Sequence, residues 1–284
     1  MPQETEAEFR ARVQAFFSAH APRRRVRPDP DAAEPVAPEA AEGQDEGGHG
    51  FLSADDGDMV SRSKAFQAAM FDAGLAGLTW PREYGGQGLT NREIQIWGEE
   101  SAAYELPASI YTIGHGMCGP TILQLGTEAQ KQRYIRPMLR GDEVWCQLFS
   151  EPGAGSDVAS LQTRAVRDGE EWVVNGQKVW SSGAHYCDWG VVITRTNLDN
   201  PKHRGISMFI VDMHSPGVTV RPLRQITGGS NFNEVFFDDV RIPAENLIGE
   251  VDEGWRVALG TLMVERFAVN QLLDNAVPAI EHAR

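Results

Sequence analysis

The chain contains very little cysteine. Three of its 284 residues are cysteines, and Cys118, Cys146 and Cys187 include no C-x-x-C pair. The seven histidines do not complete a metal-ligand spacing with them. These spacings argue against disulfides and against structural zinc, because both need paired ligands at defined separations. We therefore expect buried free thiols and no metal site.

Long hydrophobic runs are also missing. No apolar stretch reaches the roughly 18 residues that a membrane-spanning helix needs. The first residues, Met1 to Glu6, are polar and acidic, and no apolar segment of the kind found in signal peptides follows them. We therefore expect a cytoplasmic protein that does not associate with membranes.

Positive charge is scarce. The sequence has 26 Lys and Arg against 40 Asp and Glu, which gives a formal net charge of -14. Such a chain repels nucleic-acid phosphates and anionic lipid, so we expect no nucleic-acid partner. The basic run at residues 23–25 is followed by a stretch rich in Pro, Asp and Glu, and we interpret it as a solvated loop.

The pattern of hydrophobic residues predicts helices, then strands, then a helix. Residues 4–19 have helical spacing, and residues 28–58 form an acidic, Pro- and Ala-rich segment with too few large apolar residues to fold alone. Helical patterns resume near Asp58. Capping boxes at Thr90 and Thr127 begin two further helices. We assign residues 1–143 to an N-terminal helical domain, with 28–58 as a flexible segment.

Strand patterns begin near Val144. Residues 172–180 look like two short strands around the Asn175-Gly176 pair, which is typical of a β-hairpin. Further strands are expected at 191–195, 206–211, 218–221 and 235–242, and helical spacing returns from Gly254. This order predicts an α+β fold: an antiparallel β-barrel or sandwich domain at 144–247, then the start of a helical bundle at 248–284.

Residues 151–157 (Glu-Pro-Gly-Ala-Gly-Ser-Asp) carry the most informative motif. The segment lacks the third glycine, the following helix and the distant acidic residue of a dinucleotide fingerprint. It is not a G-x-S-x-G nucleophile elbow either. A loop of small residues with free amides and a hydroxyl suits close contact with an anion or a flat ring.

Together with residues around it, this motif resembles the signature of the acyl-CoA dehydrogenase family. Residues 148–157 and 175–182 match that signature, and matches in the family's order occur at 81–88, 126–131 and 237–243. The resemblance covers nearly all of residues 58–273. It implies an FAD enzyme that dehydrogenates an acyl-CoA thioester between its α and β carbons and passes the electrons to an electron-transfer flavoprotein.

In the family, the loop after the first β-strand and a later Trp-x-Thr strand hold the flavin ring. Ser150 and Ser182 stand where the family commonly has threonine, and both keep a hydroxyl. Ser156 matches a position that contacts both cofactor and thioester. The resemblance thus implies the following flavin-binding residues: Gln147, Phe149, Ser150, Gly155, Ser156, Trp180, Ser181 and Ser182.

Glu265 is the candidate catalytic base. It lies in an apolar helical pattern, where burial would raise its proton affinity and suit proton abstraction near neutral pH. The resemblance also implies that Met263 and Arg266 contact substrate. Two alternatives stay open: Glu265 forms an ion pair with a neighbour, or the base is the glutamate that most family members carry further along the chain.

The sequence ends at Arg284, where the family continues with several long helices. Three interpretations stay open: an active dehydrogenase, alone or completed by a partner chain; a non-catalytic or partial subunit of a hetero-oligomer; and an oxidase or monooxygenase on the same scaffold. A homo- or hetero-oligomer is expected in each case. The resemblance leaves open both a short acyl group and one as bulky as a sterol.

Overall fold

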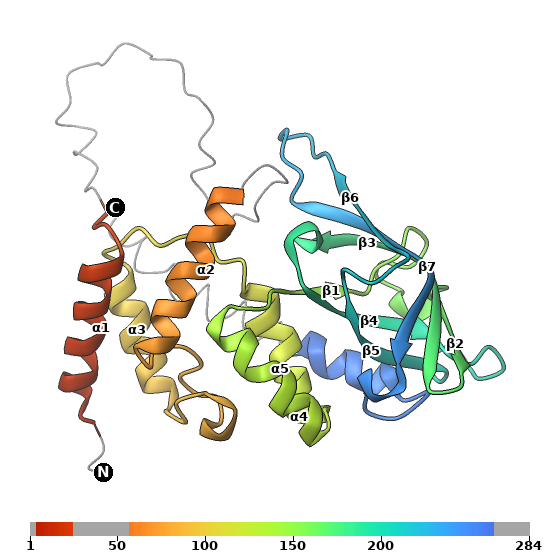
Figure 1. The fold of residues 1–284 in the computed structure, drawn as a ribbon, viewed down its shortest axis with the longest axis horizontal. Coiled ribbons are helices and arrows are strands. Elements are labelled where there is room, and N and C mark those ends of the chain that lie inside the picture. The colour runs from red at the N-terminus through yellow and green to blue at the C-terminus, as the bar shows by residue number, and fades with distance from the viewer. Residues whose placement is uncertain (1–3, 25–56, 264–284) are drawn as a thin grey trace.

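The computed structural model describes residues 4–24 and 57–263. A group of helices is followed by a large sheet and then by a further helix (Figure 1). This order confirms the predicted α+β fold. Most of the predicted 28–58 segment lies outside the described residues, but its last two residues belong to a helix. The helices of the first half are α1 (Glu6–His20), α2 (Gly57–Asp72), α3 (Asn91–Ser101), α4 (Gly119–Leu125) and α5 (Glu128–Arg140).

Capping boxes fix where three of these helices begin. The hydroxyls of Thr90 and Thr127 accept hydrogen bonds from the first turns of α3 and α5, as the sequence predicts. Thr5 does the same for α1, and Glu8 completes that box. Each box pairs backbone N–H groups that would otherwise lack partners at a helix start. These starts are therefore determined locally.

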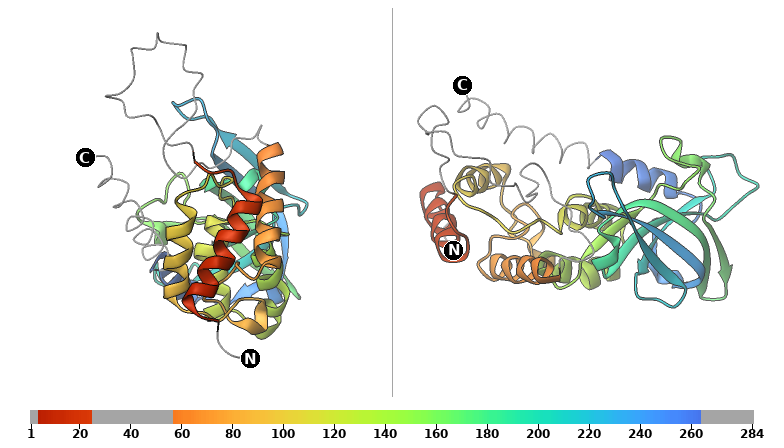
Figure 2. Two further views of the ribbon diagram at one scale, coloured as in Figure 1. Left: turned by 90° about the vertical axis from the view of Figure 1, so that its left-hand side faces the viewer. Right: turned by 90° about the horizontal axis from the view of Figure 1, so that it is seen from above.

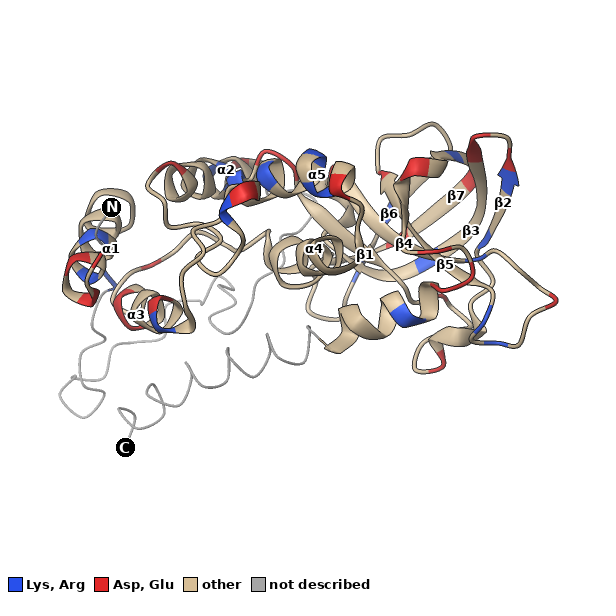
Figure 3. Ribbon diagram, turned by 90° about the horizontal axis from the view of Figure 1, so that it is seen from below, with Lys and Arg blue, Asp and Glu red and all other residues tan. Residues whose placement is uncertain are grey.

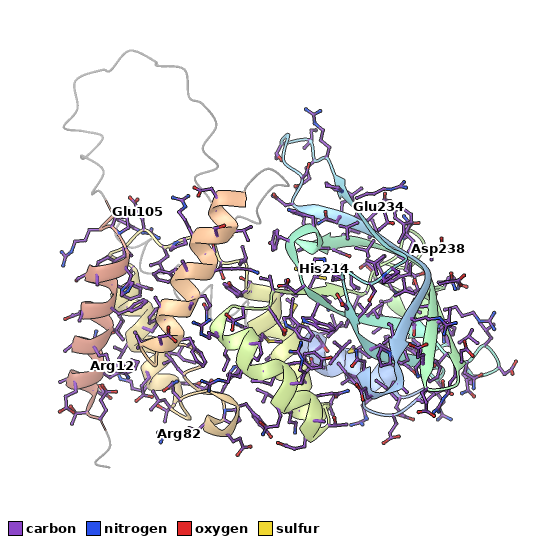
Figure 4. All side chains as sticks on the ribbon, viewed as in Figure 1. Arg12, Arg82, Glu105, His214, Glu234 and Asp238 are labelled. Atoms are coloured by element: carbon purple, nitrogen blue, oxygen red, sulfur yellow. The ribbon has the colours of Figure 1, made fainter. Side chains whose placement is uncertain are left out.

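Helix α1 is held against the helices beside it by both packing and polar contacts. Phe9, Phe16 and Phe17 are buried in an apolar core shared with α2 and α3. Arg12 of α1, labelled in Figure 4, donates a hydrogen bond of 2.9 Å to the carbonyl of Ala73, just beyond α2. These contacts give the N-terminal helices a core of their own.

The eight strands form one sheet in the order β6-β7-β3-β2-β4-β5-β8, and β1 pairs with β4. Most neighbours are antiparallel, as predicted, but β4 runs parallel to both β1 and β2. The bounds are β1 (Trp145–Leu148), β2 (Arg164–Asp168), β3 (Glu171–Ser182), β4 (Trp189–Arg195), β5 (Ile206–Asp212), β6 (Val218–Leu223), β7 (Phe232–Pro243) and β8 (Leu247–Ile248).

Both faces of the central strands are buried. On β4, Val191 and Ile193 join a core with α4 and α5, whereas Val192 joins a second core on the opposite face. Period-two alternation places these neighbours on opposite faces. The ring of Tyr134 in α5 meets that of Trp145 edge-on, with centroids 5.3 Å apart. Seen from above, the helices and the sheet lie side by side along the long axis (Figure 2).

The predicted hairpin at residues 172–180 is wrong. Strand β3 continues through Asn175 and Gly176, and its pairing with β7 shifts register there. Asn175 makes reciprocal hydrogen bonds of 2.9 Å with Asp239 of β7, so its amide group pairs across the sheet instead of forming a turn. The turn that joins β2 to β3 lies at Gly169, where φ is 62°.

Gly176 should be intolerant of any side chain. Its φ is 149°, and an added Cβ would lie 2.6 Å from the Cα of Thr163. We expect Gly176→Ala to lower the free energy of unfolding by about 3 kcal/mol, since strain and overpacking add. Gly169→Ala is the control: its Cβ meets no atom within 4 Å, and only the left-handed backbone costs about 1 kcal/mol. Equal losses in urea unfolding of the two variants would contradict this account.

After β8, a helix begins at Gly254 and is described as far as Met263. The hydroxyls of Thr121 in α4 and Thr261 lie 2.8 Å apart, which ties this helix to the first half of the chain. No helix among residues 4–24 and 57–263 is long and apolar enough to cross a membrane. Acidic and basic positions both occur along the described helices and strands (Figure 3).

Candidate functional site

The first residues of the candidate site lie at the end of strand β1. Gln147 is half-buried in register with Val191 of β4, and Phe149 is buried just beyond the strand. The carbonyl of Ser150 accepts a hydrogen bond of 2.9 Å from the backbone N–H of Val179 in β3. Two segments that the sequence places about thirty residues apart therefore lie directly side by side.

The loop after β1 begins with a tight turn at residues 151–154, and the residues that follow this turn are exposed to solvent. Glu151 and Ala154 exchange two backbone hydrogen bonds of 3.0 Å, and Ala154 is buried. Gly155 and Ser156, which follow, are exposed, and a Cβ built on Gly155 would meet no atom within 4 Å. Asp157 then pairs with Lys202. The two exposed residues are therefore held between anchored neighbours, beside open space.

Trp180 has an unusual backbone and an exposed ring. Its φ is 59°, in a region that non-glycine residues rarely adopt, and the register of β3 against β7 shifts between Lys178 and Ser181. The side chain is 61% exposed and meets Phe232 edge-on, with centroids 5.9 Å apart. A bulge that turns a large aromatic ring outward at some energetic cost is typical of a binding surface.

The two serines after Trp180 differ in environment. Ser182 is half-buried, whereas Ser181 is 1% exposed and its hydroxyl has no hydrogen-bond partner. The side-chain amide of Asn233 donates to the carbonyl of Ser181 at 3.0 Å and contacts the imidazole of His185 at 3.2 Å. Asn233 is fully buried. It therefore fixes the backbone just beyond the bulge.

Sequence reasoning missed two functional candidates, Lys178 and Glu151, which form an ion pair. Lys178 of β3 is fully buried, and its Nζ donates a hydrogen bond of 2.8 Å to the carboxylate of Glu151. Lys178 is in phase with the buried Trp172 and Val174 of β3, but the predicted hairpin interrupted the strand at Asn175 and Gly176, so this alternation was not extended to it. An acidic residue in the motif and a lysine in the strand after it were the available signal.

The remaining predicted residues are only partly described. Met263 lies on the last described helix with 51% of its surface exposed. Glu265 and Arg266 lie outside the described residues, so their predicted roles stay predictions. Cys118, Cys146 and Cys187 are buried free thiols, and within 4–24 and 57–263 no group of three His, Cys, Asp or Glu residues could hold a metal ion.

The helical half and the sheet both match models of one class of oxidoreductase. Residues 3–142 match the model "Acyl-CoA dehydrogenase, N-terminal domain", and residues 146–240 match "Acyl-CoA dehydrogenase, middle domain". The two matches follow each other in the chain as the helices and strands do. The protein belongs to the acyl-CoA dehydrogenase family.

Named relatives and a solved structure support the same family assignment. The chain is 49% identical over 203 residues to "Acyl-CoA dehydrogenase FadE34" of Mycobacterium tuberculosis, covering 72% of this chain and 28% of the relative. It is 33% identical over 234 residues to "Caffeyl-CoA reductase-Etf complex subunit CarC" of Acetobacterium woodii, covering 80% and 62%. The structure "Tcur3481-Tcur3483 steroid ACAD" superimposes with a TM-score of 0.75 at 31% identity, covering 97% of this chain and 65% of that one.

Proposed function

We propose that this chain provides the flavin-binding half of an FAD-dependent enzyme that dehydrogenates an acyl-CoA thioester between its α and β carbons. The observation that carries the proposal is the contact between Ser150 and Val179. It places the loop of 149–156 beside the part of β3 that carries Trp180, whose ring is exposed. We also propose the division into units at 1–143, 144–247 and 248–284.

The residues present fit a flat, hydrogen-bonding cofactor. The space at Gly155 is open, so a bound group can approach the backbone there. The exposed ring of Trp180 offers a stacking surface, and hydroxyls flank both segments at Ser150 and Ser182. We propose that FAD is held by Gln147, Phe149, Ser150, Gly155, Ser156, Trp180, Ser181 and Ser182.

Bound FAD would supply the acceptor for the hydride that leaves the β carbon. The chain's own residues would bind the thioester and move the α proton. Ser156 is exposed beside the loop's open space, and we propose that it contacts both cofactor and thioester. We propose Glu265 as the base that removes the α proton, with Met263 and Arg266 contacting substrate.

The colour of the purified protein tests this function. We expect it to take up FAD and show visible flavin absorbance, which acyl-CoA should bleach under anaerobic conditions. A short straight-chain thioester and a steroid-ring thioester should be compared, because the structural neighbour named "steroid ACAD" favours the second. Protein that takes up no FAD would refute the proposal. Rapid oxygen consumption after bleaching would indicate an oxidase instead.

A partial subunit of a hetero-oligomer is the second candidate function. The chain spans 28% of FadE34 and 65% of the structural neighbour Tcur3481-Tcur3483, whose double name indicates two components. An electron-transfer flavoprotein is the proposed acceptor, supported by the Etf complex named for CarC. If bleaching requires a second chain, co-expression with that chain should restore it, whereas FAD binding alone should not need it.

A further inference from the structure

A fully buried lysine lies beside the proposed flavin loop. The Nζ of Lys178 donates hydrogen bonds of 2.8 Å to the carboxylate of Glu151 and 3.1 Å to the carbonyl of Phe149. The side chain of Lys178 has no exposed surface, and that of Glu151 is 8% exposed. A buried ammonium is costly unless it is paired and hydrogen-bonded. The position of the loop is therefore coupled to this pair.

Glu151 extends the connection to a third segment. Its carboxylate also accepts hydrogen bonds from the backbone N–H groups of Gln162, at 2.6 Å, and Thr163, at 2.9 Å. Hydrogen bonds to a carboxylate are among the stronger ones in proteins. The pair thus joins β3, the loop after β1 and the approach to β2 around one buried carboxylate.

We propose that the buried Lys178–Glu151 ion pair is a positioning device for FAD. It holds the loop of residues 149–156 so that Ser150, Gly155 and Ser156 meet the cofactor, and it thereby sets FAD affinity. This inference rests on the proposed function. A buried ion pair contributes little net stability compared with apolar residues in its place, so net stability is a weak explanation for its presence.

The charges around the pair give it a distinctive pH response. Burial lowers the pKa of Lys178 to about 8, and the charge of Glu151 opposes this only in part. Burial disfavours the ionised form of Glu151, but the charge of Lys178 and the hydrogen bonds outweigh it, so the pKa of Glu151 lies below its ordinary value. The charge of Glu151 also acts on Arg195 of β4, where it opposes the lowering of the pKa of that guanidinium by burial.

Stability and FAD affinity should therefore move in opposite directions as the pH rises through 8. In the unfolded chain Lys178 keeps its proton up to its ordinary pKa of 10.5. Between pH 8 and pH 10.5, Lys178 is protonated in the unfolded chain but largely deprotonated in the folded protein. Because the unfolded state binds more protons there than the folded state, the contribution of Lys178 to folding stability rises with pH. Over the same range the folded protein loses the ion pair. FAD affinity should fall, which a purely structural role would not produce.

The test compares variants by FAD titration, followed through flavin fluorescence, and by amide hydrogen exchange of residues 149–163 without FAD. Lys178→Met, Glu151→Gln and the double variant should each weaken FAD binding at least tenfold and speed exchange at Ala154 and Thr163. The double variant should recover thermal stability, because no buried charge lacks a partner. Glu171→Gln is the control: Glu171 lies on β3, as Lys178 does, and the change breaks its exposed pair with Arg241 of β7. This variant should change neither readout.

Three results would overturn the inference. They are FAD affinity in the double variant within twofold of the unaltered protein, loop amides that stay protected in it, and pH-independent affinity of the unaltered protein across pH 8. If the unaltered protein binds no FAD, the proposed function fails instead. Hydrogen exchange then decides by itself whether the pair orders the loop.

Discussion

Replacing Glu265 by glutamine should slow bleaching of the flavin by acyl-CoA by about a thousandfold. Glutamine keeps the size of the side chain but cannot accept the α proton. FAD binding should be unchanged, because the proposed flavin residues lie elsewhere in the sequence. Stopped-flow absorbance gives the bleaching rate, and FAD titration gives the affinity.

Glu253→Gln is the matched control for this substitution. Glu253 is exposed just before the last described helix, and its replacement makes the same change in charge, so bleaching should keep its normal rate. Normal bleaching by the Glu265→Gln protein would exclude Glu265 as the base. The base would then be a different carboxylate, of this chain or of a partner chain.

A side chain at Gly155 should strongly weaken FAD binding without unfolding the protein. A Cβ at this position meets no atom of the chain within 4 Å, and Gly155 is not among the glycines with positive φ. Gly155→Val should therefore change the free energy of unfolding by less than about 0.5 kcal/mol. Because the added isopropyl group would occupy space proposed for the ligand, FAD affinity should fall at least about a hundredfold, or roughly 2.7 kcal/mol.

Gly57→Val provides the comparison, since a Cβ on Gly57 also meets no atom within 4 Å and Gly57 lies at the start of α2, far from the loop in sequence. That variant should bind FAD normally. If Gly155→Val also binds FAD with normal affinity, the open space at Gly155 is not part of the cofactor site. Calorimetric unfolding of all three proteins shows whether a loss of affinity reflects a loss of fold.

Short-range patterns were sufficient to predict much of the fold. The capping boxes at Thr90 and Thr127 begin helices as expected, because such a box involves only residues three positions apart. The strands expected at 191–195 and 235–242 occur within β4 and β7. The hairpin at Asn175-Gly176 failed, although the local signal was strong. Pairing with Asp239, across the sheet, overrode the turn preference of these two residues.

For the candidate site, the sequence supplied the residue types and their order, and their matches to the family motifs predicted the loop of 149–156 and the strand that carries Trp180. Only the tertiary structure showed that Trp180 is turned outward from a bulge and that Lys178 is buried against Glu151. The physical reason is that inward or outward orientation depends on strand register and on bulges, which are fixed by pairing with distant strands. A local pattern carries no information about such pairing.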